Sequence, residues 1–178
     1  ESLQLERRGR LDTSEAQWFE IVHGKTAALF RWAMFAGGRA GDLAHDQCEV
    51  LERYGRHLGV AFQAIDDLLD LTGDPDETGK ALFTDLREGK LTHPLIRSLE
   101  REPGLRPRLE ELLATDSPPP ELPEAILATL ERTGSLDAAR ALALEHAEAA
   151  KAAVRELPPS RARDALETVA DSVVHRPS

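Results

Sequence analysis

Residues 51–71 read LERYGRHLGVAFQAIDDLLDL, and their pattern is the clearest structural signal in the chain. An α-helix turns by about 100° per residue, so apolar residues that recur every three or four positions share one face. We therefore predict one long helix from about Asp42 to Leu71. Its apolar stripe would consist of Leu51, Tyr54, Leu58, Phe62, Ile65 and Leu69.

The composition of the whole chain favours helices. The 178 residues are 41% hydrophobic and 4% aromatic, and Ala, Leu, Glu and Arg dominate. These are good helix formers, and no segment alternates polar and apolar residues with β-branched enrichment. The length suffices for one domain or for part of a larger one. We predict the all-α class.

Charge and cysteine content exclude several functions. The net charge of −10 and the lack of a Lys/Arg-rich block argue against a nucleic-acid surface. The single cysteine, Cys48, rules out an internal disulfide and suits the reducing cytoplasm; we expect it to be an ordinary buried or half-buried thiol. We find no signal peptide and no apolar run near the roughly 18 residues that a membrane span needs. The first residue is Glu1 and not a methionine, so we expect a fragment of something longer.

Further helices follow from caps and breaks. Thr13 or Ser14 can cap a helix that runs to about Gly37, and Ser14 and Gln17 have capping-box spacing. After a loop over residues 73–91, helices are predicted from Thr92 and over 121–133, 135–156 and 160–174. Such short breaks predict an antiparallel helical bundle.

Acidic residues gather beside the apolar stripe of the long helix. Gln63, Asp66, Asp67 and Asp70 share a face, and Gly59 one turn earlier would leave room beside them. Like charges four residues apart oppose helix formation slightly, and a divalent cation would relieve the repulsion. Oxygen ligands suit Mg²⁺, which is often shared with a substrate phosphate. The alternative for this motif alone is a solvated acidic face near a helix end.

Lysines near the acidic helix favour an anionic ligand. Lys80 and Lys90 follow in the loop, with Asp85 between them, and two lysines beside carboxylates suit a polyanion with bound metal. Lys25 interrupts an apolar stripe of Trp18, Val22, Leu29 and Trp32. An inward-facing lysine must either extend to solvent or find an anion.

These segments together resemble a known family. Residues 59–80 (GVAFQAIDDLLDLTGDPDETGK) and 85–94 (DLREGKLTHP) resemble the second aspartate-rich region of the polyprenyl synthetase family. Residues 24–30 (GKTAALF) look like its Lys-Thr helix, and residues 173–176 (VVHR) are similar to its C-terminal end. The resemblance implies that residues 1–178 are the C-terminal half of an isoprenoid synthase fold, of the farnesyl or geranylgeranyl diphosphate synthase type.

The resemblance also implies an activity. A trans-isoprenyl diphosphate synthase condenses isopentenyl diphosphate with an allylic diphosphate to give a longer trans-polyprenyl diphosphate, with Mg²⁺ assisting departure of the diphosphate. Four residues would serve one Mg²⁺ of a three-metal cluster, directly or through water: Asp66, Asp67, Asp70 and Asp85.

Substrate contacts follow from the same resemblance. Lys25 and Lys80 would bind the allylic diphosphate, and Lys90 would support the same binding site. Thr26 and Gln63 would face the carbocation left behind, which makes Lys25, Thr26 and Gln63 the candidate catalytic residues. Arg176 would reach toward the diphosphate of isopentenyl diphosphate.

Two departures from the family pattern matter. The family usually has Gly where this chain has Phe83, a ring that would either narrow the diphosphate pocket or pack under the loop. The first aspartate-rich motif and the upstream basic residues are absent from these 178 residues. We therefore expect no turnover by this half alone, and a homodimer is a family expectation.

Other functions stay open at this point. A non-catalytic regulatory subunit of a heteromeric prenyl diphosphate synthase is the main alternative. A terpene cyclase and a plain structural bundle are two more. We expect His45, His57 and His146 to lie on different helices or faces and to form no ligand pair.

Overall fold

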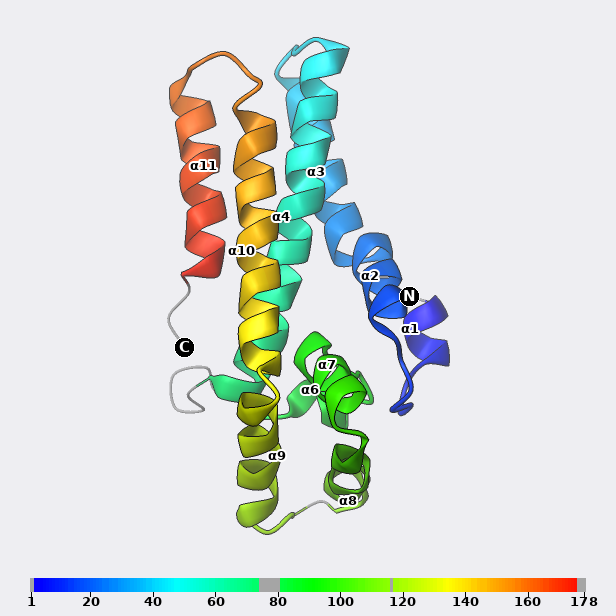
Figure 1. Ribbon diagram of the computed structural model, residues 1–178. Coiled ribbons are helices and arrows are strands. Elements are labelled where there is room, and N and C mark those ends of the chain that lie inside the picture. The colour runs from blue at the N-terminus through cyan, green and yellow to red at the C-terminus, as the bar shows by residue number, and fades with distance from the viewer. Residues whose placement is uncertain (1, 74–80, 116, 176–178) are drawn as a thin grey trace. The chain divides into compact units, whose positions relative to one another are not determined.

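The computed structural model describes residues 2–73, 81–115 and 117–175, and all regular elements in these ranges are helices. Figure 1 shows their arrangement, which confirms the all-α prediction. The elements are α1 (Ser2–Glu6), α2 (Glu15–Gly24), α3 (Thr26–Ala40), α4 (His45–Thr72), α6 (Thr84–Arg87), α7 (His93–Arg101), the 3₁₀ helix η1 (Pro103–Leu105), α8 (Arg106–Ala114), α9 (Glu121–Arg132), α10 (Ser135–Val154) and α11 (Arg161–Val174). None of these helices is long and apolar enough to cross a membrane.

The described residues form two compact units. The first unit comprises residues 2–18 and 66–140, and the second comprises residues 19–65 and 141–175, apart from the gaps given above. Helices α2, α4 and α10 each contribute residues to both units. The long helix predicted from the sequence is therefore present as α4, and it supplies residues to both cores.

The second unit is a helical bundle, in which α3, α4, α10 and α11 run alongside one another (Figure 1). The hydroxyl of Tyr54 donates a hydrogen bond to the carbonyl of Leu166 on α11, at 2.8 Å. Small alanines on α10 let the helices approach closely, and burial of the apolar stripe provides most of the stability of such a bundle. The core consists of Leu51, Tyr54, Leu58, Ala61, Ala147, Ala150, Ala153, Val154, Ala170 and Val173.

Two glycines of α4 let α3 pack against it. A Cβ atom at Gly59 would lie 2.6 Å from the Cα of Ala27, and one at Gly55 would lie 2.6 Å from the carbonyl oxygen of Phe30. The space at Gly59 is therefore filled by the backbone of α3. Our expectation that this glycine leaves room beside the aspartates was wrong, because it was made without the neighbouring helix.

The first predicted long helix is broken. Lys25 leaves helical geometry at φ −118° and ψ −83°, which separates α2 from α3. The break changes which face points inward: Trp18 and Val22 are 4% and 3% exposed, whereas Leu29 and Trp32 are 65% and 67% exposed. The single apolar stripe predicted across this segment was therefore wrong, because a stripe needs a continuous helix.

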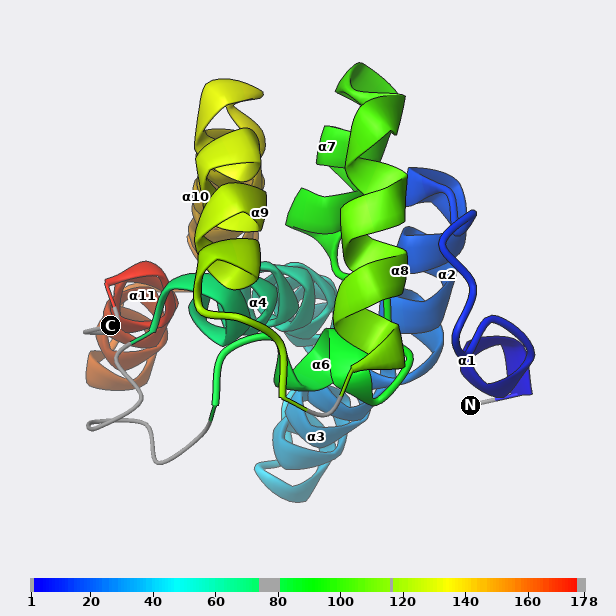
Figure 2. The ribbon, with the colours of Figure 1, turned by 90° about the horizontal axis from the view of Figure 1, so that it is seen from below.

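The first unit contains shorter helices. Helix α7 contacts η1 and α9, and α8 contacts α6 and α9 (Figure 2). The N-terminal segment joins this unit, because the N–H of Gly9 donates to the carbonyl of Gly89 at 2.8 Å. Gly89 has a φ of +83°, and a Cβ there would lie 2.7 Å from the backbone nitrogen of Gly9. Ser14 and Gln17 exchange the two hydrogen bonds of a capping box, as predicted.

The close contact at Gly59 generates a stability prediction. Gly59→Ala should lower the free energy of unfolding by about 1–3 kcal/mol, because the added methyl group overlaps backbone that cannot move aside. Gly37→Ala is the matched control: Gly37 lies in α3 with open space around it, and alanine there should be neutral or stabilising by up to about 1 kcal/mol. Urea unfolding measures both. Equal effects of the two changes would contradict the described packing.

Candidate metal centre

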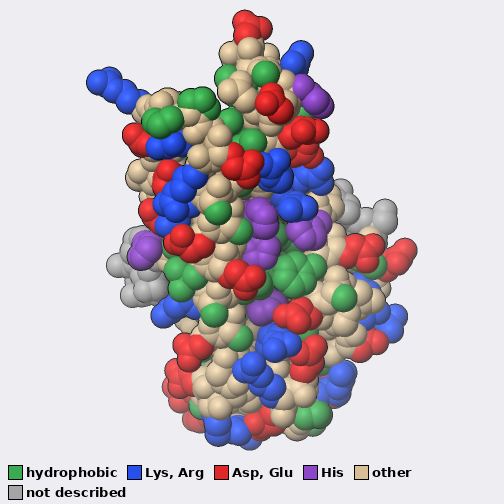
Figure 3. All heavy atoms as spheres, turned by 45° about the horizontal axis from the view of Figure 1, so that its top comes forward, with side chains coloured by type: hydrophobic (Ala, Val, Ile, Leu, Met, Phe, Trp, Pro, Cys, Tyr) green, Lys and Arg blue, Asp and Glu red, His purple; other side chains and the backbone are tan. Residues whose placement is uncertain are grey.

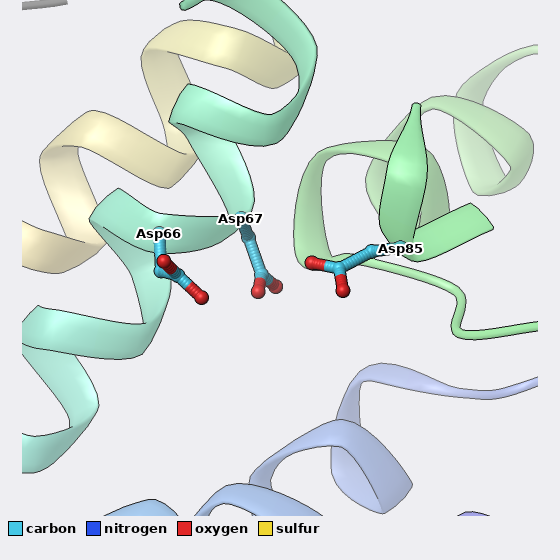
Figure 4. Close-up of side chains that lie close together, drawn as sticks. All are labelled: Asp66, Asp67 and Asp85. Atoms are coloured by element: carbon cyan, nitrogen blue, oxygen red, sulfur yellow. The ribbon is translucent and has the colours of Figure 1, made fainter. Parts of the chain in front are cut away.

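Three aspartates converge in the first unit. Asp66 and Asp67 lie on α4 and Asp85 lies on α6, and their side chains point toward one another (Figure 4). One carboxylate oxygen from each lies within 4.8 Å of those of the other two. Hard oxygen ligands at this spacing suit Mg²⁺ or Ca²⁺. The structure thus brings together three of the four predicted metal ligands.

The cluster opens into a pocket of about 590 Å³. Asp66, Asp85 and Lys90 line it, as does Asp70, the fourth predicted ligand. Pockets of this size accommodate small ligands. Acidic and basic side chains that face the same space suit a metal ion together with an anion.

Asp70 connects α4 to the loop that carries Asp85. One of its carboxylate oxygens accepts the N–H of Asp85 at 3.1 Å, and its backbone carbonyl accepts the N–H of Phe83 at 2.9 Å. Its Oδ2 atom is buried and has no hydrogen-bond partner among the described residues. Burial raises the pKa of Asp70 to about 6, and the neighbouring charges of Asp85 and Asp66 add to the effect. Its role as a metal ligand stays a prediction.

Asp67 is the most buried of the three clustered aspartates, at 3% exposure. Its Oδ2 atom accepts hydrogen bonds from the indole N–H of Trp18 at 2.8 Å and from the backbone N–H of His93 at 3.0 Å. His93 is the first residue of α7, so the carboxylate satisfies an N–H that lacks a partner within that helix. Asp67 therefore positions both chain segments beside the cluster.

His93 extends this network away from the aspartates. Its Nε2 atom lies 3.0 Å from a carboxylate oxygen of Glu15, which also pairs with Arg97 at 3.3 Å. Burial lowers the pKa of His93, and the hydrogen bond to Glu15 opposes that shift. Sequence reasoning predicted His93 only as a helix start and Trp18 only as an apolar residue. Their contacts with Asp67 span 26 and 49 residues, so no local signal indicates them.

Lys90 lies at the edge of the pocket. Its ammonium group pairs with Asp85 at 2.8 Å and with Glu88 at 2.7 Å. Burial works against its charge, but the hydrogen bonds to these two carboxylates outweigh burial and raise the pKa of Lys90. Lys90 is thus a permanent cation next to the cluster. Two of the other three predicted diphosphate contacts, Lys80 and Arg176, lie outside the described residues.

The predicted catalytic residues Lys25, Thr26 and Gln63 belong to the second unit. The hydroxyl of Thr26 donates a hydrogen bond to the side-chain oxygen of Gln63 at 2.8 Å, so the structure brings this predicted pair together. Lys25 is exposed at the break between α2 and α3, where the backbone leaves helical geometry. The bend therefore lies at the predicted substrate-binding lysine.

Phe83 does not line the pocket. It is 1% exposed, so its ring packs in the interior and does not narrow the described part of the pocket. Its φ of 61° and ψ of 26° lie in the left-handed region. That conformation costs about 1–2 kcal/mol for a residue other than glycine. The backbone here explains why glycine suits the position, and burial of the ring offsets the strain.

Helical architecture and converging aspartates together define an all-α protein with a candidate carboxylate metal centre. A family model described as polyprenyl synthetase matches residues 1–130. The chain belongs to the polyprenyl synthetase family.

Several relatives cover nearly the whole chain. A short chain isoprenyl diphosphate synthase of Methanothermobacter thermautotrophicus is 37% identical over 177 residues, which are 99% of this chain and 54% of that protein. The octaprenyl diphosphate synthase of Escherichia coli is 34% identical over 176 residues, again 99% of this chain and 54% of that protein. The chain therefore spans about half the length of the curated relatives it matches.

A solved structure of a polyprenyl synthase is also similar over nearly the whole of this chain. The polyprenyl synthase of Caulobacter crescentus, in a crystal structure complexed with calcium and isoprenyl diphosphate, is 36% identical. The TM-score is 0.89, and the match covers 99% of this chain and 54% of that one. This similarity confirms the predicted isoprenoid synthase type of fold.

The burial of Asp67 generates a second prediction. Asp67→Ala should lower the free energy of unfolding by about 2–4 kcal/mol, because it leaves the indole N–H of Trp18 and the N–H of His93 buried without a partner. Asp66→Ala, one position earlier and half-buried, should change it by less than about 1 kcal/mol in metal-free buffer. Chemical denaturation measures both variants. A similar loss in the two would show that Asp67 has no special positioning role.

Proposed function

We propose that this chain forms the aspartate-rich wall of the active site of a trans-prenyl diphosphate synthase, which joins isopentenyl diphosphate to an allylic diphosphate. The observation that carries the proposal is the cluster of Asp66, Asp67 and Asp85 next to an open pocket, which Asp66 and Asp85 line. Membership of the polyprenyl synthetase family and the synthases among the relatives support it. The proposal favours a catalytic role over a regulatory subunit, because the charged residues of the site are intact.

The residues fit a divalent cation. Three carboxylates offer hard oxygen ligands, and the buried Oδ2 atom of Asp70 beside them suits a metal ion or its bound water. A similar polyprenyl synthase was crystallised with calcium and isoprenyl diphosphate. We propose Mg²⁺ as the cation in this chain; when bound, it would offset the charge of the departing diphosphate. Asp67 would hold its place in the ligand set through its bonds to Trp18 and His93.

The basic and polar residues receive complementary roles. Lys25 and Lys80 would bind the allylic diphosphate, Lys90 would limit the net negative charge of the pocket, and Arg176 would contact isopentenyl diphosphate. Lysine ammonium groups stabilise developing phosphate charge electrostatically. Thr26 and Gln63 would direct oxygen dipoles at the carbocation, and their mutual hydrogen bond fixes the orientation of the amide.

The proposed active site must be completed by a further part of the family domain. Leu29 and Trp32 stand exposed on α3, and the relatives are about twice as long as this chain. We propose that the remaining part of the family domain packs on this face of α3 and completes the site, so that residues 1–178 alone do not turn over. A homodimer is the expected assembly. The lone buried thiol of Cys48 suits the cytoplasm.

The activity can be tested in a polypeptide that joins this chain to the rest of a family domain. With Mg²⁺, isopentenyl diphosphate and an allylic diphosphate, it should make a longer prenyl diphosphate. Asp66→Ala should lower kcat/KM by about 100-fold or more, because it removes a ligand that acts on transition-state charge. Asp46→Ala, an exposed aspartate on the same helix, should stay within about twofold.

Other outcomes of this assay identify other functions. Full activity of the Asp66 variant would refute the assigned metal centre. Activity that appears only after addition of a separate catalytic chain would identify a regulatory subunit. Release of a hydrocarbon or alcohol from the allylic substrate alone would identify a terpene cyclase.

The exposed face of α3 generates its own prediction. Acrylamide should quench the fluorescence of Trp32 readily in the 178-residue chain, because two thirds of that side chain is exposed. Joining or adding the remaining part of the domain should reduce the quenching constant at least twofold. Comparison with Trp32→Phe isolates the signal, and the buried Trp18 is the internal control. Unchanged quenching of Trp32 would refute packing on this face.

A further inference from the structure

Two histidines of the second unit face each other. His57 on α4 and His146 on α10 bring their Nδ1 atoms to 3.2 Å, with ring centroids 5.1 Å apart and ring planes at 46°. Figure 3 shows histidine side chains gathered on one face of the molecule. The two histidines lie on different helices, as expected, but their proximity was not predicted from the sequence. The two residues are 89 positions apart, and the packing of α4 against α10 in the hydrophobic core brings them together.

The geometry suits one metal ion in front of both nitrogens. With metal–nitrogen bonds of about 2.0–2.1 Å, a nitrogen separation of 3.2 Å gives an angle of about 100° at the metal, close to tetrahedral. The same arrangement puts the ring centroids about 5 Å apart, near the observed 5.1 Å. A straight N–H···N hydrogen bond would separate them by about 5.5 Å, and hydrogen bonds prefer to be straight.

The chemistry of the pair also suits a metal. Burial lowers the pKa of His57 to about 4 and also lowers the pKa of His146, so both rings are neutral at neutral pH, as metal ligation requires. His23 adds a third imidazole nearby: the Phe19 ring stacks 6.1 Å from His23 and lies 6.3 Å from His146.

The surrounding charges are mixed. Arg56 on α4 and Arg31 on α3 act against a cation in this region, whereas Glu145 beside His146 favours one. Imidazole prefers borderline metals such as Zn²⁺ and Ni²⁺, whereas carboxylates prefer Mg²⁺ and Ca²⁺. The ligand type therefore separates this pair chemically from the aspartate cluster.

We propose that His57 and His146 bind a transition-metal dication of the Zn²⁺ class through their Nδ1 atoms, with water in the remaining positions. The ion would link α4 to α10 at the partly buried edge of the second unit's hydrophobic core. Two protein ligands make a weaker and more open site than the three or four of typical zinc centres. This proposal does not depend on the proposed synthase activity.

The test uses the 178-residue chain after removal of metal with a chelator. Calorimetric titration with Zn²⁺, in buffer with excess Mg²⁺ to occupy the aspartate cluster, should show one bound ion per chain. His57→Gln and His146→Gln should each weaken binding at least tenfold, while glutamine retains the size and polarity of the site. His45→Gln is the matched control, because His45 is exposed and pairs with Glu49 on its own helix; it should stay within twofold.

Three results would overturn the proposal. They are absence of Zn²⁺ binding, equal binding by all three histidine variants, and loss of binding only in Asp66→Asn. A measurement without substitution covers the case in which a variant fails to fold. In ¹⁵N spectra of the unmodified chain, Zn²⁺ should shift the Nδ1 resonances of two histidines. Shifts only at Nε2, or at none, would contradict Nδ1 ligation.

Discussion

The carboxylate of Asp67 accepts two hydrogen bonds on a single oxygen, from the indole of Trp18 and from the first N–H of α7. Burying a charged group is costly unless it is hydrogen-bonded, and these donors meet that requirement. In return, the carboxylate fixes the start of α7 and the start of α2 relative to the end of α4 within the first unit. Asp66 is its neighbour on the helix, so the same anchor determines where the candidate metal ligand points.

A second constraint acts on α6. Asp70 accepts the N–H of Asp85 with its side chain and the N–H of Phe83 with its backbone carbonyl. These two bonds hold the short helix against α4 and so bring the third aspartate of the cluster within range. Phe83 tolerates a left-handed backbone because its ring is buried in the same region. The candidate metal centre is therefore held together in part by ordinary hydrogen bonds and packing.

The sequence predicts those features that depend on neighbours along one helix. The extent of α4, its apolar face and the adjacency of Asp66 and Asp67 follow from helical periodicity. The break at Lys25 does not, because Gly24-Lys25-Thr26 contains no proline and the bend occurs where α3 packs on Gly55 and Gly59. Contacts such as that between Trp18 and Asp67 cannot be predicted from periodicity either, because only tertiary packing brings together residues 49 positions apart. The role of each predicted site residue rests on the family resemblance rather than on periodicity.

Helix α4 shows how one segment can present different chemistry on different faces. Gly55 and Gly59 have no side chain, and this lets the backbone of α3 approach closely. Leu58 and Ala61 pack in the core with alanines of α10. His57 is adjacent to Leu58, so the packing that buries the leucine also determines where the imidazole lies. A change of register between α4 and α10 would therefore disturb the hydrophobic core and the histidine pair at once. The aspartate cluster depends instead on the hydrogen bonds of Asp67 with Trp18 and His93 and of Asp70 with Phe83, all in the first unit. The two candidate metal sites share a helix but rest on separate sets of contacts, so each should respond to mutation independently of the other.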